Sequence, residues 1–434
     1  MGTPSMPIFT MFTGTWPKRH SMMIWLVIAL LLCYIDRILI SLAAIEMQNE
    51  FGWSDSDKGL VLSSFFMGYL IMQLLGGILA NRYGGRNVFL IAVLLWSLFT
   101  ILTPLAASIS FGTLILVRFM LGFGEGAAYP AGYSLIHEWM PRKERSVSIS
   151  LISAAGAVGT VSALLVTGRL IELYGWQAVF YFFGSLGFVW SVFWLIKIPS
   201  SAEPHNDPLS LRKKEKRERK AIPWKLCLTH PAVLTLYLVT AVGSSVSYTM
   251  ASWLPSYFVD TFALTTTQAG LYSILPWLVV AIVAVIAGRY ADKLIAQNMA
   301  PRKVRVRITL TGFTLLFVSL IAITFAPSAI GAVLLICCLF AAMGILIPGY
   351  SPIPAELLPE HGEILYGFMA SAGSISSVFL VYLAGLLLDE TGSYDALFYS
   401  FAAMALLAAV VFFFFAQATP IYTTKMATDI SSVQ

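Results

Sequence analysis

Four ionisable side chains lie deep within long apolar stretches of this sequence. They are Asp36, Arg37, Arg118 and Glu125, and all belong to the N-terminal half of the chain. An ionisable group inside a membrane span is energetically costly, so such residues mark substrate, ion or proton pathways by default. Buried carboxyl groups can take up and release protons, and a guanidinium group can hold a carboxylate or phosphate with two parallel hydrogen bonds. The pattern therefore predicts charge chemistry within a membrane.

Arg118 and Glu125 are seven residues apart, so on a helix they share one face but lie about 10 Å apart along the axis. That separation is too long for direct contact without help from another helix. Glycines 122, 124 and 126 leave this face open, either to close helix contact or to a ligand. Desolvation favours a protonated carboxyl group and a nearby arginine favours the ionised one, so protonation of Glu125 can follow conformation. A structural ion pair is the alternative interpretation.

Asp36 and Arg37 are adjacent, hence about 100° apart around a helix, and cannot point in the same direction. One of them can face a central cavity while the other reaches a neighbouring helix. An intrahelical anchor pair with no functional role is the alternative.

The composition places these residues in a membrane protein. Of 434 residues, 58% are hydrophobic and 11% are charged, whereas a soluble protein carries about 25% charged residues. Much of the surface must therefore face lipid, and the length has room for about twelve spans. Phosphate-binding loops, zinc-helix motifs and nucleophile elbows are absent from the sequence, and its four cysteines have no metal-ligand spacing. We expect no enzyme activity, no metal, no cofactor and no nucleic-acid partner.

The apolar stretches predict an all-α membrane protein with six spans in each half. The first set lies at 22–47, 58–80, 86–107, 111–137, 146–170 and 175–197, and the second at 230–258, 268–296, 304–327, 329–356, 363–389 and 395–418. The predicted organisation is an N-terminal segment (1–21), a six-helix bundle (22–197), a basic linker (198–229), a second six-helix bundle (230–418) and a tail (419–434).

The positive charges predict how the chain crosses the membrane. Of the 27 lysines and arginines, Arg37 and Arg118 lie within predicted spans, and Lys58 and Arg169 are assigned to loops of the opposite face. All the others fall on the side of the N-terminus. Positive loops mark the cytoplasmic side. Both termini and the linker are therefore expected to be cytoplasmic, which requires an even number of spans.

The two halves carry related sequence. Residues 77–82 read Gly-Ile-Leu-Ala-Asn-Arg after the second predicted span, and 288–293 read Gly-Arg-Tyr-Ala-Asp-Lys after the eighth. Phe180-Tyr181 and Phe398-Tyr399 stand near the start of the sixth and twelfth. Parallel six-helix repeats about a central axis are a transporter architecture.

Several longer motifs resemble the anion:cation symporter family of the major facilitator superfamily. They are Tyr34-Ile35-Asp36-Arg37, Gly76-Gly77 with Arg82, Gly84 and Arg86, Arg118-Phe119 with Gly122, Glu125-Gly126 and Tyr129-Pro130, Trp139 with Pro141 and Glu144-Arg145, Gly175-Trp176, Trp253-Leu254-Pro255-Ser256-Tyr257, and Leu275-Pro276-Trp277. The resemblance covers nearly the whole chain and implies a major facilitator fold with two pseudo-symmetric bundles.

The resemblance also implies roles. Glu125 would be the proton-coupling carboxylate with Asp36 a second protonatable group, Arg37 would receive the substrate carboxylate, and Arg118 would tune Glu125 or exchange with it. The expected substrate-binding set comprises Tyr34, Arg37, Tyr69, Gln73 and Arg118 in the first half and Tyr248, Ser371 and Ser374 in the second. The expected gating set comprises Arg82, Arg86, Glu144, Arg145 and Asp292. Packing alone is an equal alternative for Ser371 and Ser374, which have small-residue spacing.

Three positions depart from the family pattern. Asn81 stands where most members carry an aspartate of the cytoplasmic gate, so a weaker gate is expected. Ser244 and Ser245 replace an arginine of the vesicular glutamate carriers, which argues against a second cationic anchor. Serines stand in the eleventh span where sugar-acid symporters carry asparagine, so a smaller or less hydroxylated anion is an option.

The sequence thus predicts a secondary transporter in which an organic anion, such as a sugar acid or a small mono- or dicarboxylate, moves with protons by alternating access. Inorganic phosphate symport and proton-driven export of an anionic metabolite are the alternatives. A non-transporting anion sensor would need an output, yet only a short tail follows Phe415. We expect a monomer surrounded by lipid, placed in a bacterial inner membrane.

Overall fold

The computed structural model describes residues 18–199, 223–359 and 361–421, and these form only α-helices and short connections. The helices are α1 (Lys18–Phe51), α2 (Asp55–Tyr83), α3 (Gly85–Ile109), α4 (Phe111–Gly126), α5 (Ala128–Trp139), α6 (Arg142–Tyr174), α7 (Trp176–Lys197), α8 (Trp224–Thr229), α9 (Pro231–Phe262), α10 (Thr266–Ala296), α11 (Pro301–Ile323), α12 (Ala329–Tyr350), α13 (Ile353–Leu357), α14 (Gly362–Thr391) and α15 (Asp395–Phe415).

Twelve segments of the described residues are long and apolar enough to cross a membrane, which confirms the predicted number of spans. Ten are single helices. The fourth span (Phe111–Trp139) combines α4 with α5, and the tenth (Ala329–Leu357) combines α12 with α13. Most helices extend a few residues beyond the apolar stretch, because polar residues at a helix end can satisfy the free backbone groups there.

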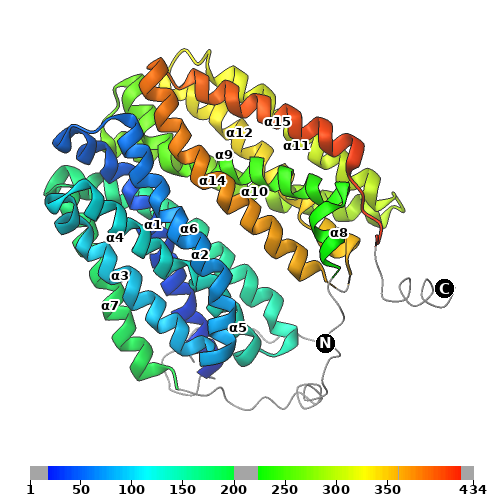
Figure 1. Ribbon diagram of the computed structural model, residues 1–434, viewed down its shortest axis with the longest axis horizontal. Coiled ribbons are helices and arrows are strands. Elements are labelled where there is room, and N and C mark those ends of the chain that lie inside the picture. Colours follow the sequence, from blue (N-terminus) through cyan, green and yellow to red (C-terminus); the bar gives the residue numbers. More distant parts are fainter. Residues whose placement is uncertain (1–17, 200–222, 360, 422–434) are drawn as a thin grey trace, which may run out of the picture.

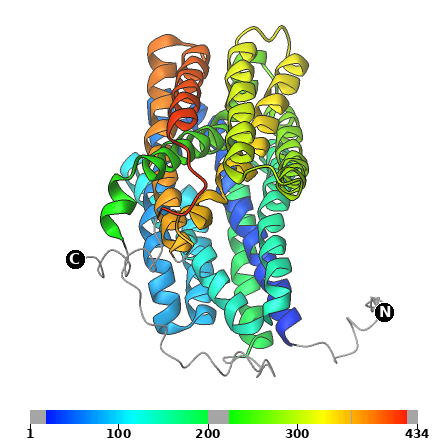
Figure 2. The same cartoon turned by 90° about the vertical axis from the view of Figure 1, so that its right-hand side faces the viewer.

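The spans form two bundles, as Figure 1 shows. Helices α1–α7 make the N-terminal bundle and α9–α15 the C-terminal bundle. In a view turned by 90°, helices of the C-terminal bundle lie in front of and partly over those of the N-terminal bundle (Figure 2). The bundles meet where α2 packs on α14, α6 on α10 and α1 on α9. This is the predicted two-bundle fold.

Equivalent helices of the two bundles begin in the same way. Ser54 and Asp57 form a capping box before α2, and Thr265 and Gln268 form one before α10. In each box the first side chain accepts a backbone N–H and the fourth reaches back to the first residue's N–H. The second and eighth spans, which carry the repeated motif near their ends, thus also share a start signal.

Parts of the predicted organisation lie outside the described residues. They include the basic run 212–220 of the linker, residues 1–17 and residues 422–434. Within the linker as predicted, residues 224–229 form the short helix α8. The cytoplasmic placement of the termini stays a prediction.

Candidate functional site

A buried ion pair joins α1 to α4 inside the N-terminal bundle. Nη2 and Nε of Arg37 donate to Oε2 of Glu125 over 2.9 Å and 3.2 Å. Glu125 is fully buried and Arg37 is 8% exposed. Charge-assisted hydrogen bonds of this kind are strong, and removing one partner of a buried pair leaves an uncompensated charge. The spacing in the sequence drew attention to Arg118 as the neighbour of Glu125, but the side chain that contacts it comes from another helix.

The two oxygens of Glu125 have unequal surroundings. Oε2 accepts both bonds from Arg37 and a third from Sγ of Cys33 at 3.3 Å. Oε1 is buried, and the described residues provide it with no hydrogen-bond partner. A proton can therefore be added at Oε1 without displacing an existing contact.

Aromatic rings surround the Arg37 guanidinium. Its Cζ lies 4.6 Å from the ring centre of Tyr69, 4.9 Å from that of Tyr34 and 5.3 Å from that of Phe65. Aromatic faces attract a cation and exclude water, so they strengthen electrostatic interactions at this point. The rings also restrict the guanidinium to a small range of orientations.

A break in the fourth span places Glu125 at the end of α4. Pro130 has no N–H to donate to the carbonyl of Gly126, and its ring conflicts with a continuous helix there. The structure shows the break at Ala127, where a turn separates α4 from α5. Discontinuous helices are common at binding sites in transporters.

The glycines near Glu125 serve close helix contact, which settles an alternative left open by the sequence. A Cβ added to Gly126 would lie 2.9 Å from the backbone nitrogen of Gln73, and one on Gly124 would lie 2.9 Å from that of Trp96. One on Gly122 would overlap the carbonyl oxygen of Phe65. These contacts hold α4 tightly against α2 and α3 and so fix the position of Glu125 relative to those two helices.

Asp36 and Arg118 lie close by as two more buried charges. They are 2% and 1% exposed. Within the described part of the chain, Oδ1 of Asp36 and Nε and Nη1 of Arg118 have no hydrogen-bond partner. Cζ of Arg118 lies 5.3 Å from the ring centre of Phe65, the ring that Arg37 also contacts. Around Phe65 the bundle therefore places Arg37 and Arg118 near Asp36 and Glu125, and of these four groups Arg37 and Glu125 are in direct contact.

Three adjoining chambers lie between the bundles. The main chamber, about 520 Å³, is lined mostly by α1, α6, α9, α10 and α12. The arginine chamber, about 160 Å³, reaches Arg37. The hydroxyl chamber, about 170 Å³, is lined by Gln73, Thr240, Ser244, Tyr248, Tyr350, Ser351, Tyr366, Met369, Ala370 and Ser374. Tyr248 borders all three, so the chambers adjoin one another at this side chain.

Charge and polarity divide unevenly among the chambers. Among the described residues that line them, Arg37 is the one charged side chain. The C-terminal bundle contributes hydroxyl groups instead, including Ser244, Ser247 and Tyr248. The cavity thus presents one cationic end and one neutral, hydroxyl-rich end.

The predicted substrate-binding residues divide into two groups. Tyr34, Arg37, Gln73, Tyr248 and Ser374 line chambers, and the hydroxyl of Ser374 donates to the Gln73 amide oxygen at 3.2 Å, joining α14 to α2.

The other three do not line the chambers. Tyr69 and Arg118 are buried behind Arg37 and Phe65. Ser371 bonds to the carbonyl of Gly367 in its own helix.

The predicted gating residues contact their own bundle. Arg86 donates to the carbonyl oxygen of Ile198 at 2.8 Å, Arg145 to that of His137 at 2.8 Å, and Glu144 lies 3.4 Å from Arg19. The side chains of Arg82 and Asp292 are exposed. The structure therefore does not bring these five together.

Sequence reasoning missed several cavity residues. Thr240, Tyr350 and Tyr366 line the hydroxyl chamber, and Thr160 and Trp277 line both of the others. A tyrosine near a span end is ordinarily read as an interfacial anchor, and a lone threonine in a span carries no signal. Trp277 was noticed only as part of a family motif.

The fold and the site together define a class of protein. Two six-span bundles with a cavity between them, bordered by a buried charge pair, form a membrane transporter. A sequence model of the Major Facilitator Superfamily matches residues 26–364. The chain belongs to this superfamily and, by its motifs and relatives, to the anion:cation symporter family.

The relatives include three named plant proteins. The chain is 36% identical to "Probable anion transporter 4, chloroplastic" of Oryza sativa subsp. japonica, covering 88% of this chain and 66% of that one. It is 34% identical to the Arabidopsis thaliana proteins "Ascorbate transporter, chloroplastic" and "Sodium-dependent phosphate transport protein 1, chloroplastic", covering 92% and 88% of this chain and 75% and 76% of theirs. The chain thus spans about two thirds to three quarters of their length.

Solved structures agree on the fold. A bacterial homologue of the human lysosomal transporter Spinster matches with a TM-score of 0.77 at 20% identity, covering 92% of this chain and 97% of that one. A D-xylose–proton symporter matches with a TM-score of 0.72 at 17% identity, covering 92% and 98%.

The expected location needs a correction. The relatives named above are chloroplast proteins of plants, so the prediction of a bacterial inner membrane is wrong. Hydropathy and loop charge predict that a chain crosses a membrane, but they do not distinguish one kind of membrane from another. The twelve spans support a multi-pass membrane protein.

Proposed function

We propose that this chain is a proton-coupled symporter of an organic anion with one acidic group, working by alternating access. The observation that carries the proposal is the contact of Arg37 with Glu125 at the edge of the arginine chamber. Arg37 is the cation of this chamber. Among the described residues, it is also the one basic side chain that donates hydrogen bonds to Glu125. An incoming anion and Glu125 therefore compete for one guanidinium.

That competition supplies a coupling mechanism. When a substrate carboxylate takes the two donors of Arg37, Glu125 is left as an unpaired carboxylate in a fully buried site. An unpaired buried charge is costly, so the carboxyl group takes up a proton, and Oε1 is free to receive it. Anion and proton then bind together. When the substrate leaves, Arg37 returns to Glu125 and the proton is released.

The shape of the cavity favours an organic anion over inorganic phosphate. Arg37 can bind either group. The main chamber, about 520 Å³, falls within the range of about 300–1,000 Å³ that sites for small organic molecules occupy. The hydroxyl chamber beyond Tyr248 offers donors and acceptors that a phosphate bound at Arg37 would not use. Relatives named for ascorbate and for phosphate keep both options within the family.

The hydroxyl chamber suggests that the substrate carries hydroxyl groups at the end remote from its acid. Oγ1 of Thr240 is buried there, and the described residues give it no partner. Replacing Thr240 by valine, which has nearly the same shape, should leave folding stability unchanged or slightly higher. Affinity for a hydroxy acid such as gluconate should fall about fivefold to tenfold through loss of one hydrogen bond.

The control for Thr240→Val is a set of mono-deoxy derivatives of the same acid, measured by calorimetric titration. One derivative should bind native protein and variant equally, because it lacks the hydroxyl that Thr240 contacts. If Thr240→Val bound every derivative more weakly than native protein by the same factor, Thr240 would not contact the substrate.

The experiment that tests the function uses purified protein in liposomes. Proton entry is recorded on adding sugar acids, plain monocarboxylates, dicarboxylates or phosphate. One monoanionic organic acid should drive proton entry and phosphate should not. Proton entry with phosphate alone would establish the alternative. Outward movement of an anion driven by an imposed proton gradient would instead establish export.

The names of the relatives favour a plastid membrane as the location of this chain. Imaging of a fluorescent fusion beside chlorophyll in plant cells would test this part of the proposal.

A further inference from the structure

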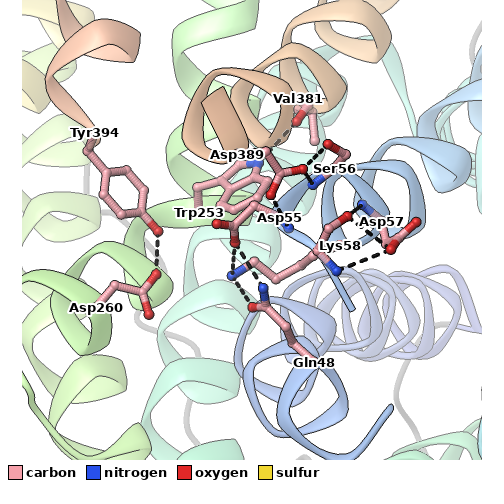
Figure 3. A network of polar contacts seen from close by, with 11 residues as sticks. Gln48, Asp55, Ser56, Asp57, Lys58, Trp253, Asp260, Val381, Asp389 and Tyr394 are labelled. Atoms are coloured by element: carbon pink, nitrogen blue, oxygen red, sulfur yellow. Dashed lines mark hydrogen bonds and ion pairs between the residues drawn. The ribbon is translucent and has the colours of Figure 1, made fainter. Parts of the chain in front are cut away.

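The two bundles are joined at one end by a carboxylate that caps a helix of the other bundle. This end, at which α1 stops and α2 starts, is called the Ser54 end. Oδ1 and Oδ2 of Asp389, at the end of α14, accept the backbone N–H groups of Asp55 and Ser56 at 2.8 Å each. The Ser56 hydroxyl also donates to Asp389 (Figure 3). A negative group is stabilised at a helix N-terminus by its free N–H groups and by the helix dipole.

A buried lysine lies beside this cap. Lys58 was assigned from the sequence to a loop, but it belongs to the first turns of α2 and is 1% exposed. Its Nζ donates to Oε1 of Gln48 at 2.7 Å and lies 3.4 Å from Oδ1 of Asp55. It also lies 4.7 Å from the ring centre of Trp253 on α9 of the C-terminal bundle (Figure 3).

The backbones of the two bundles approach closely at the same place. A Cβ on Gly59 of α2 would lie 3.1 Å from the carbonyl oxygen of Tyr382 on α14. One on Gly385 of α14 would overlap the carbonyl oxygen of Asp55. Trp253 is fixed by a hydrogen bond of 3.1 Å from Nε1 to the Val381 carbonyl oxygen. The ring that covers Lys58 is therefore part of a rigid surface.

The neighbouring interface is closed at the same end. Oγ1 of Thr266, at the start of α10, donates to Oε1 of Glu46 on α1 at 2.7 Å. A Cβ on Gly270 of α10 would lie 2.6 Å from the Leu164 carbonyl oxygen on α6. Both main lines of contact between the bundles are thus sealed at the Ser54 end.

At the opposite end, which carries Arg82, the bundles are not joined in this way. Among the described residues, the charged side chains of Arg86, Glu144 and Arg145 bond within the N-terminal bundle. A Cβ on Gly77 or Gly288, on the repeated motifs after the second and eighth spans, would have no atom within 4 Å. Among the described residues, the contacts that join the bundles at the Ser54 end therefore have no counterpart in these side chains of the Arg82 end.

We propose that the Asp389 cap and the Lys58 contacts form an electrostatic latch that holds the Ser54 end shut, and that opening this latch gives the other state of the transport cycle. The latch rests on the proposed function, because a cycle of alternating access needs a contact that forms and breaks once per turnover. Its parts suit reversible use. Asp389 is exposed, so water can replace its bonds. When Trp253 moves away, Lys58 keeps its hydrogen bond to Gln48 and its ion pair with Asp55, and both partners belong to its own bundle.

Opening would return Asp389 and the N–H groups that it caps to water and would leave the neighbouring groups with partners in their own bundles. The capping box of Ser54 and Asp57 keeps part of the α2 terminus satisfied without Asp389. In the C-terminal bundle, the Tyr394 hydroxyl donates to Asp260 at 2.7 Å. Burial, together with that carboxylate, raises the pKa of Tyr394 well above its usual range, so the hydroxyl stays a donor. The two bundles can therefore separate at the latch, because the side chains on each facing surface keep hydrogen bonds within their own bundle.

The test measures the width of the Ser54 end in the purified full chain. Spin labels are placed at Ser108→Cys and Phe325→Cys, exposed positions on opposite bundles near this end, with Cys337 and Cys338 replaced by alanine. Native protein should show mainly the short distance. Asp389→Asn should raise the population ratio of long to short distances about threefold to tenfold, since it removes the charge from the helix terminus.

Glu390→Gln is the matched control, because Glu390 is the next residue, carries the same charge and is exposed. It should leave the distances unchanged. Ser56→Ala removes one bond to Asp389 and should give a smaller shift in the same direction, which keeps the test decisive if Asp389→Asn folds poorly. Unchanged distances in Asp389→Asn and Ser56→Ala, or an equal shift in Glu390→Gln, would overturn the latch. The distances need no substrate, so they stand even if the proposed anion symport fails.

Discussion

Replacing Arg37 by glutamine is expected to abolish anion binding and transport. The change removes the single charged side chain among the described residues that line the cavity, and glutamine cannot offer two parallel charged donors. Loss of a buried charged contact weakens binding by at least about 100-fold, which corresponds to about 2.7 kcal/mol. Calorimetric titration with the anion selected by the liposome panel measures this loss.

The control separates binding from folding. Arg37→Gln leaves Glu125 buried without its partner, which can destabilise the bundle. The double variant Arg37→Gln with Glu125→Gln has no unpaired charge at this place, so it should fold and still fail to bind. Arg169→Gln removes an exposed arginine, 65% accessible, and should behave as native. Binding within a factor of about two of native by the double variant would contradict the role of Arg37.

Glu125→Gln is expected to separate anion movement from proton movement. Glutamine has a similar shape and cannot be ionised, so it resembles the protonated carboxyl group that the mechanism assigns to the loaded transporter. Labelled anion should exchange across liposomes at a near-native rate, whereas accumulation driven by a proton gradient should be lost. Parallel exchange and proton-entry assays on the same preparation measure the two effects.

The outcome that would count against this role is a variant that still concentrates the anion under a proton gradient. Asp36→Asn tests the other buried carboxyl group in the same assays. If Asp36→Asn alone lost proton-driven accumulation and kept exchange, Asp36 would be the coupling group. Loss of exchange in Glu125→Gln would show that the carboxyl group is needed for conformational change.

The spans could be predicted because hydropathy depends on residues that are neighbours in the sequence. All twelve observed spans coincide with predicted stretches. Burial of Asp36, Arg37, Arg118 and Glu125 was also predictable, since a charge in an apolar run is visible without a structure. The partner of Glu125 was not, because Arg37 lies on another helix and spacing along one helix carries no information about contacts between helices.

Other features depended on the arrangement of helices in space. Lys58 is the last residue of the polar run 54–58, so its sequence context is that of a loop residue, yet Trp253 from the other bundle covers it. Asp389 lies at the end of an apolar run and looked like an ordinary span boundary. The hydroxyl chamber combines side chains of α2, α9, α12 and α14. Gln73, Tyr248 and Ser374 were predicted to bind substrate, whereas Thr240, Tyr350 and Tyr366 carried no signal of their own.

The central claim is that an anion and Glu125 compete for Arg37, so that binding of the anion brings a proton with it. The most direct measurement is the number of protons taken up when the purified protein binds its anion in detergent, recorded with a pH indicator in weakly buffered solution near neutral pH. We predict uptake of about one proton per bound anion in the native protein and none in Glu125→Gln. Anion binding by native protein with no change in bound protons would contradict the mechanism, because the carboxylate released from Arg37 would then have stayed ionised.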